Sequence, residues 1–200
     1  MKGIMNCRTI RVSLCIVSVL VLAPALAAVA GAQDQARVGI TMGFPTAIGV
    51  IIHATDKVAV RPDFSFSTST SEGPTSSSSD GWAVGAGVSA LFYVATHDHL
   101  RTYVSPRLSY SKFSSTSTSS ISTPATTFTS TATNSAWGGA GSFGAQYAPT
   151  PKFSVFGEVG FGYSHQSGRS TISSGLGVPP TEVKGHGWGT RAGVGVVFYP

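Results

Sequence analysis

The sequence predicts an all-β protein: a closed eight-stranded antiparallel up-and-down transmembrane β-barrel. Three observations support this fold class. Apolar and polar residues alternate with a period of two through most of the chain after residue 36, and no helical period is sustained. Beyond the N-terminal segment, no apolar stretch reaches the length of a membrane-spanning helix, so a membrane protein of this kind has to close a sheet. Aromatic residues also recur in pairs that are ten residues apart.

Residues 1–32 have the features of a secretory signal peptide. A positively charged start, an apolar run over 12–26 and small residues at 30–32 predict cleavage before Gln33. A membrane anchor is the alternative, but the small residues and the polar segment that follows favour cleavage. We therefore expect an exported chain whose only domain, residues 33–200, is the barrel.

Cleavage would change the composition of the mature chain. Both cysteines, Cys7 and Cys15, lie in the predicted signal peptide, so neither a disulfide nor a cysteine nucleophile is expected in the barrel. Without Lys2, Arg8 and Arg11, ten basic residues remain against eight acidic ones, and no basic cluster is left. This balance argues against a nucleic-acid partner.

The alternating segments divide the chain into eight strands, an even number, as in bacterial barrels. The first strand alternates Val38, Ile40 and Met42 with small or polar residues, and Pro45 turns the chain into the second. In order, the strands are expected at about 37–44, 47–54, 57–70, 81–95, 100–113, 135–147, 153–166 and 186–199.

The segments between these strands are of two kinds. Short turns are expected at 55–56, 96–99 and 148–152, and long loops rich in Ser, Thr, Gly and Pro at 71–80, 114–134 and 167–185. Outer-membrane barrels have short turns at one rim and long loops at the other. Because the mature chain starts on the short-turn side, we expect that rim to be periplasmic.

Aromatic residues mark two levels along the strands. Trp82 is followed ten residues later by Phe92, and the other two tryptophans have partners at the same spacing. An even spacing places both aromatics on one face, and ten tilted residues rise about 25 Å, the height of the apolar band on such barrels. Core aromatics of a sandwich are the alternative. The predicted girdles comprise Trp82, Trp137, Trp188, Tyr110 and Tyr163 near the long loops and Phe92, Tyr147, Phe153 and Phe198 near the short turns.

The opposite face of the strands carries small and charged residues. An eight-stranded barrel has room for packed side chains but for no wide channel. We therefore expect arginines to pair with the two acids of this face inside the barrel, because buried charges persist when they are paired. A conduction path is the alternative. The predicted ion-pair network consists of Arg61, Asp63, Arg101, Arg107, Glu158 and Arg191.

With these features, the mature chain resembles the small OmpA/OmpX-like outer-membrane barrels of Gram-negative bacteria. The last strand is similar to the assembly signal of that family, through Arg191, Gly193, Val196 and Phe198, although Tyr199 follows the terminal aromatic position. The resemblance implies insertion by the barrel-assembly machinery and an outer-membrane location. Its implied partners are the lipid bilayer and lipopolysaccharide, around a monomer.

The resemblance says little about activity, because such barrels include adhesins, tethers and a few enzymes. We expect a non-enzymatic envelope protein with external Ser/Thr-rich loops, which have a structural or surface-contact role, and we expect no metal or cofactor. Two alternatives stay open. His165 and Ser167 resemble a pair found in lipid A deacylases, which would make the chain an acyl hydrolase, but a third group to orient the histidine is not evident. The other alternative is a narrow pore of low conductance.

Overall fold

The computed structural model describes residues 38–44, 47–73, 77–122, 125–173 and 179–200. The predicted signal peptide, residues 1–32, and the predicted start of the mature chain at Gln33 lie outside these ranges. No helix within the described ranges is both long enough and apolar enough to cross a membrane.

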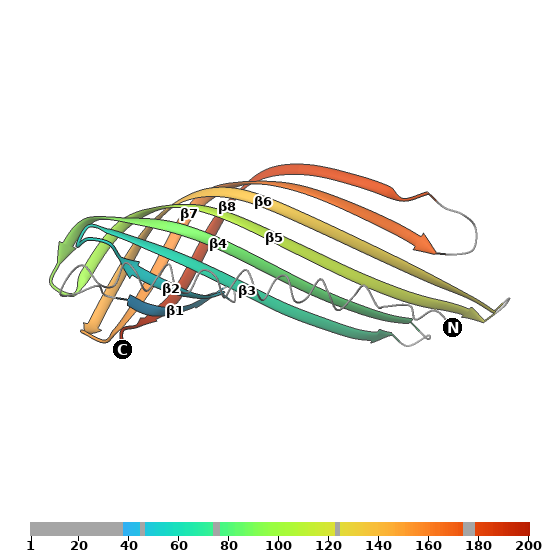
Figure 1. Ribbon diagram of the computed structural model, residues 1–200, viewed down its shortest axis with the longest axis horizontal. Coiled ribbons are helices and arrows are strands. Elements are labelled where there is room, and N and C mark those ends of the chain that lie inside the picture. The colour runs from blue at the N-terminus through green and yellow to red at the C-terminus, as the bar shows by residue number, and fades with distance from the viewer. Residues whose placement is uncertain (1–37, 45–46, 74–76, 123–124, 174–178) are drawn as a thin grey trace, which may run out of the picture. The chain divides into compact units, whose positions relative to one another are not determined.

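The described residues form eight antiparallel strands that close into a barrel, which confirms the predicted fold class (Figure 1). Each strand pairs with the next in sequence, and the first pairs with the last, from Ile40 opposite Phe198 to Phe44 opposite Val194. The strands are β1 (Val38–Phe44), β2 (Ala47–His53), β3 (Val58–Gly73), β4 (Ser77–His97), β5 (Leu100–Ser122), β6 (Ala125–Thr150), β7 (Phe153–Ser173) and β8 (Thr181–Phe198).

The long loops expected at 71–80, 114–134 and 167–185 are mostly strand, so that prediction was wrong. β5 and β6 stay in register from the short turn as far as Ser122 opposite Ala125. The pairing brings hydroxyl side chains of neighbouring strands within hydrogen-bond distance, as for Thr116 Oγ1 and Thr131 Oγ1 at 3.4 Å. Threonine is β-branched and favours strands, so a polar Ser/Thr tract can continue a sheet where apolar periodicity has ended.

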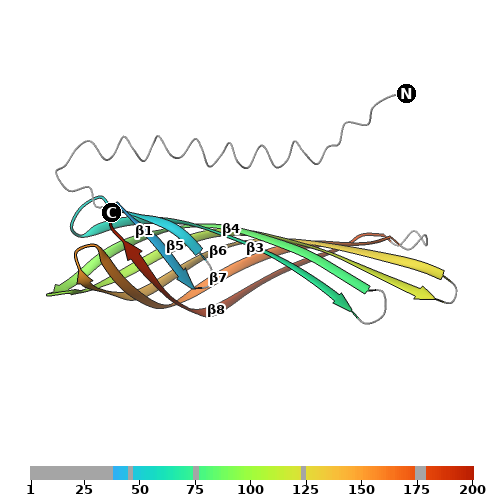
Figure 2. The same ribbon diagram turned by 90° about the horizontal axis from the view of Figure 1, so that it is seen from below.

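Strands β3 to β8 run well beyond β1 and β2 (Figures 1 and 2). β2 pairs with β3 only as far as Phe64, and β1 pairs with β8 only as far as Val194. Among the described residues, β3 and β8 do not pair with each other beyond these points. The wall thus continues as a sheet of six strands, with a seam between its β3 and β8 edges; the part of this sheet beyond the level of Trp82, Trp137 and Trp188 is here called the extension.

The two faces of the barrel wall have opposite character. Large apolar side chains point outward on every strand, and their exposed fractions include 72% for Trp188, 71% for Phe44 and 66% for Leu108. The side chains between them point inward and are small or polar, as for Ser89 and Ser105, which are fully buried. A soluble barrel would have the reverse arrangement, with its apolar residues inside.

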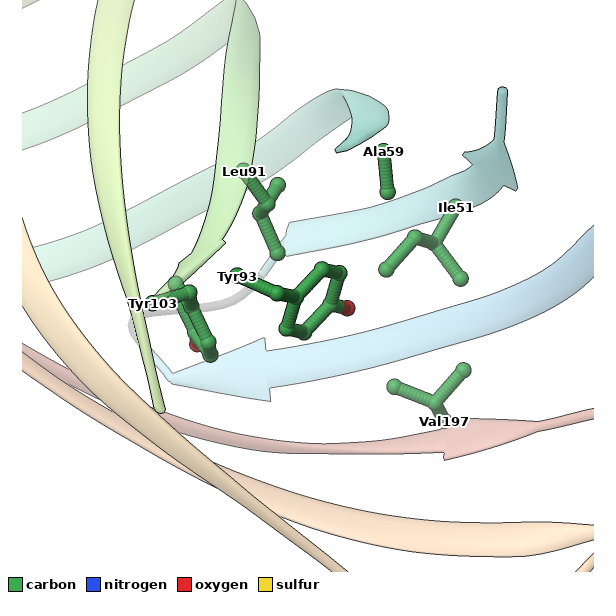
Figure 3. Close-up of a cluster of buried hydrophobic side chains, with 6 residues drawn as sticks. All are labelled: Ile51, Ala59, Leu91, Tyr93, Tyr103 and Val197. Atoms are coloured by element: carbon green, nitrogen blue, oxygen red, sulfur yellow. The ribbon is translucent and has the colours of Figure 1, made fainter. Parts of the chain in front are cut away.

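The interior is filled near the short turns. Figure 3 shows six buried apolar side chains that converge there from β2, β3, β4, β5 and β8. Tyr103 is completely buried, and its ring meets that of Tyr93 edge-on at 5.6 Å between centroids. These side chains close the short-turn end of the interior; we call them the plug, and they are Ile51, Ala59, Leu91, Tyr93, Tyr103 and Val197.

Candidate functional site: the polar interior

The first of two ion pairs in the interior joins β3 to β7. Arg61 Nη2 donates to Glu158 Oε1 at 2.5 Å, and the two side chains are 7% and 5% exposed. Tyr103 Oη donates to the same carboxylate oxygen at 2.9 Å, and the guanidinium of Arg61 lies 4.7 Å from the ring centroid of Phe156. Glu158 therefore has both a cation and a hydroxyl donor, which offset the cost of burying its charge.

The second ion pair joins β5 to β3. Arg107 and Asp63 form a two-pronged contact, with Arg107 Nη2 at 2.6 Å from Asp63 Oδ1 and Arg107 Nη1 on Asp63 Oδ2. Ser89 Oγ accepts a further bond from Arg107 Nη1 at 3.3 Å. A bidentate arginine–carboxylate contact fixes geometry as well as charge, because the planar fork matches the carboxylate.

Two glycines leave room for these side chains. A Cβ at Gly87, opposite Asp63 in the register, would collide with the guanidinium of Arg107. A Cβ at Gly144, opposite Glu158, would lie 2.5 Å from the ring of Tyr103. The absence of side chains at these positions lets large polar groups cross a narrow interior.

The remaining two predicted network members are placed differently. Arg101 lies at the short-turn rim, where it donates to the backbone carbonyl of Asp56 and stacks 3.7 Å from the ring centroid of Tyr93. It forms no ion pair within the described residues, so its predicted place among the carboxylates was wrong. Arg191 lines the interior beside both ion pairs but has no carboxylate within 4.0 Å among the described residues.

A polar network below the ion pairs was not predicted. Tyr93 Oη donates to Gln146 Oε1 at 2.9 Å, and Gln146 Nε2 donates to Ser154 Oγ at 2.7 Å. Tyr199, which follows the terminal aromatic position of the predicted assembly signal, turns inward and places its hydroxyl 2.9 Å from His53 Nε2. Alternation could have found these residues, because each is an even number of positions from an inward residue of its strand.

The aromatic residues of the predicted girdles point outward. Near the extension, Tyr163 packs between two tryptophans, with centroids 6.0 Å from Trp137 and 5.1 Å from Trp188. Near the short turns, the Phe153 and Phe198 rings lie 5.1 Å apart. Exposed fractions are 40% for Trp82, 52% for Tyr110, 45% for Phe92 and 51% for Tyr147.

The residues of the predicted assembly signal all lie on β8. Arg191 and Gly193 face the interior, whereas Phe198 faces outward and lies opposite Ile40 of β1 and Phe153 of β7. Val196 lies opposite Met42 on the same outward face. The last strand thus presents a mixed polar and apolar surface at the point where the ring closes.

The candidate hydrolase pair is not organised for catalysis in the described structure. His165 packs against the Trp137 ring at 5.8 Å, and Ser167 Oγ lies 3.2 Å from Ser135 Oγ. Glu158 points to the opposite face of the same strand, into the interior. Nucleophilic catalysis requires a base bonded to the hydroxyl and a group that orients the base, and neither contact is formed. In the described part of the chain, no three His, Cys, Asp or Glu side chains gather to hold a metal ion.

A closed ring with an apolar exterior and a polar interior defines the class of small outer-membrane β-barrel proteins, and the chain has this fold. A major outer membrane protein from Thermus thermophilus matches it with a TM-score of 0.52 and 13% identity, over 81% of this chain and 98% of that one. No protein-family model matches the chain, and no curated protein does. At this identity the likeness concerns the fold alone.

Two further outer-membrane structures are similar at lower scores. Acinetobacter baumannii CarO matches with a TM-score of 0.46 and 13% identity, over 84% of this chain and 100% of that one. Ail, the attachment invasion locus protein of Yersinia pestis, matches with a TM-score of 0.38 and 11% identity, over 81% of this chain and 93% of that one.

Proposed function

We propose that the chain is a non-enzymatic outer-membrane barrel whose extension forms a surface-contact structure outside the cell. One observation carries the proposal: the outward face is apolar between two aromatic levels, while the ion-paired charges at that height lie in the interior. In water this arrangement would expose a large apolar surface, whereas in a bilayer it matches the lipid. The proposed partners are the lipid bilayer with its lipopolysaccharide, and the barrel-assembly machinery during insertion; the protein acts as a monomer.

The orientation follows from the predicted signal peptide and the shape of the two rims. A chain that enters from the periplasm keeps its short turns there and sends the other ends of its hairpins, here the extension, across the membrane. The extension then stands outside the cell. Its surface is dominated by serine and threonine hydroxyls, which form hydrogen bonds without a fixed charge, as a general contact surface requires.

Labelling of single introduced cysteines tests location and orientation together. Both natural cysteines lie in the predicted signal peptide, so a mature chain has no competing thiol. Ser119→Cys in the extension should react with a membrane-impermeant maleimide on intact cells. Lys152→Cys in the β6–β7 turn should react only after the outer membrane is permeabilised. Both side chains are exposed, so the comparison is matched for access. Labelling of Lys152→Cys alone on intact cells would reverse the proposed orientation, and labelling of neither would refute a surface location.

The contact role is tested on cells that carry either the full chain or one with shortened hairpins. Attachment to host-cell monolayers and to abiotic surfaces should fall when the extension is removed while the surface level of the protein is held equal. Equal attachment by both strains would contradict the contact role and leave the structural role.

A further inference from the structure

The charges inside the barrel do not balance. Between the plug and the extension, the described interior holds three arginines and two carboxylates. The carboxylates of Glu158 and Asp63 are engaged by Arg61 and Arg107. Arg191 is the remaining cation, because no described carboxylate lies within 4.0 Å of its guanidinium. Glu158 and Asp63 still act electrostatically on Arg191, but each already pairs with another arginine, so the group as a whole is positively charged and favours the entry of an anion.

Arg191 borders two cavities of the interior. A cavity of about 100 Å³ adjoins the ion pairs. A larger one of about 290 Å³ lies towards the extension, where its inward side chains are hydroxyls from two other strands and otherwise mostly glycine and alanine. Ser109 and Ser111 of β5 and Ser164 of β7 supply these hydroxyls, and no carboxylate lines this cavity. The space therefore contains one cation, several neutral donors and no competing anion.

The donor set fits one class of ligand. A guanidinium presents a planar fork of N–H donors, which pairs with two oxygens of a phosphate group. Hydroxyls that approach from β5 and β7 can donate to the remaining oxygens from other directions, as a tetrahedral group requires. A small volume walled by residues with little or no side chain lets such a group approach the backbone closely.

The larger cavity is a blind vestibule. The plug closes the interior on the short-turn side, with Tyr103 and Leu91 at 0% and 1% exposure. Access remains from the extension and from the seam, since Arg191 lies on β8 three residues beyond Val194, the last residue that pairs with β1. A soluble phosphate could enter from the first side and the headgroup of a membrane lipid from the second.

We propose that Arg191, with the surrounding serine hydroxyls, binds a phosphate group in this vestibule. The binding is a property of the interior and does not depend on the contact role of the extension. The proposed orientation bears only on the source of the phosphate, which is either a dissolved ion or a lipid of the outer leaflet.

Calorimetry on the purified full chain in a phosphate-free amine-oxide detergent tests the proposal. One arm titrates inorganic phosphate, and the other titrates phosphatidic acid in mixed micelles, with phosphatidylcholine as the lipid control. Binding in the first arm identifies a soluble source, and binding in the second arm alone identifies a lipid source; either supports the proposal. No binding in both arms would overturn it. Because the protein is purified, this result is independent of the cell-surface labelling.

Variants then assign the binding to Arg191. Arg191→Gln should weaken it by about tenfold or more, the effect of losing charge-assisted hydrogen bonds. Arg169→Gln is the matched control, since Arg169 is exposed on the outer face of the extension and lies opposite Glu182. Heat-modifiable migration in gels verifies folding. If Arg191→Gln does not fold, Arg191→Lys is used in its place. This variant keeps the charge but loses the planar pair of guanidinium donors, so phosphate binding should still weaken. Unchanged affinity in the folded variant would refute the site.

Discussion

At the scale of single residues, the interior depends on two carboxylates that are almost completely buried. Glu158 has one cation and one hydroxyl as partners, and both come from other strands. The pair with Arg61 therefore ties β7 to β3 across the lumen, in addition to the backbone ladders. A buried ion pair adds little stability compared with apolar side chains of the same volume. The loss of one partner, however, leaves the other charge buried and unpaired.

Glu158→Gln should lower the free energy of unfolding by about 3–5 kcal/mol, because Arg61 would then be buried without a counter-charge. The side chains have nearly the same shape, so the loss reports charge and not packing. Equilibrium unfolding in urea from phospholipid vesicles, followed by tryptophan fluorescence, measures it.

Glu182→Gln is the control for that variant. Glu182 is exposed on β8 in the extension, in register with Arg169, and even an ion pair at such a surface position would contribute under about 1 kcal/mol. A loss in Glu158→Gln no larger than in Glu182→Gln would mean that the Glu158 carboxylate is solvated and that the interior is not packed as described.

The glycine opposite Glu158 gives a second residue-scale prediction. Gly144→Ala places a methyl group against the Tyr103 ring and should cost about 1–3 kcal/mol through overpacking. Gly141→Ala, three residues earlier on β6, meets nothing within 4 Å and should be close to neutral. Thermal unfolding of the two variants in detergent compares them. Equal melting temperatures would show that Tyr103 is free to move away.

Which residues face inward could be predicted from the sequence, but which of them meet could not. Alternation along each strand placed Asp63 and Arg107 on the interior face, where the structure holds them in contact. Arg101 has the same parity, yet it reaches the rim and not a carboxylate. The height of a side chain inside a barrel depends on the register and the shear between strands. Whether its position in the strand is odd or even gives its face but neither of these quantities.

At the scale of elements, the extension is held together by cross-strand pairs of hydroxyl residues. Ser114 Oγ lies 3.5 Å from Thr133 Oγ1, two residues before the Thr116–Thr131 pair on the same face. Each such pair contributes only tenths of a kcal/mol. The backbone ladder in the extension is in contact with water, so its loss costs much less than a break in lipid would.

A shortened β5–β6 hairpin should therefore leave the barrel intact. Replacing residues 116–131 with an Asn-Gly turn joins Ser115 to Ala132, which already lie opposite each other, and Asn-Gly suits a two-residue hairpin. The variant should fold into vesicles with an unfolding free energy within about 1 kcal/mol of the full chain, since the removed pairs are weak. Heat-modifiable migration in gels and urea unfolding measure the result.

A matched deletion within the barrel wall is the control for the hairpin. Removing residues 107–110 together with their partners 137–140 takes away a shorter ladder, four pairs against seven, at the level of the aromatic residues, yet this chain should not insert. If the shortened hairpin also fails to insert, the extension is part of the folding unit and not an appendage.

The membrane-spanning parts of the strands could be predicted, and the extension could not, for one physical reason. Apolar residues alternate along a strand because one of its faces is in contact with lipid. The alternation therefore ends where the strands leave the membrane. The Ser/Thr tract over 114–134 has no apolar period and matches the composition of a loop. A weaker signal was present, because Thr129, Thr131 and Thr133 alternate with other residues at the period of a strand.

At the scale of the whole molecule, the barrel is closed at one end and open at the other. The plug fills the short-turn end, and the vestibule beside Arg191 lies on the extension side of it. This arrangement argues against the narrow-pore alternative, because the buried tyrosine, leucine and valine side chains of the plug fill the interior at that end.

Planar bilayers should show no steady conductance for the full chain. A double variant, Leu91→Gly with Tyr103→Ser, removes two large and fully buried side chains of the plug and should produce small currents in the inserted protein. Steady channel openings by the full chain would show that the plug moves, and the narrow pore would become the better account of the interior.

If the wall faces lipid, the three tryptophans lie in the bilayer interface at the aromatic level nearer the extension. Fluorescence quenching by brominated phospholipids tests this most directly, on three variants that each keep one of Trp82, Trp137 and Trp188 with the others changed to Phe. Bromines placed shallow in the acyl chains should quench each tryptophan strongly, and deep ones should quench it more weakly. Tryptophans that no bromine quenches, or that only the deepest bromines quench, would contradict this placement.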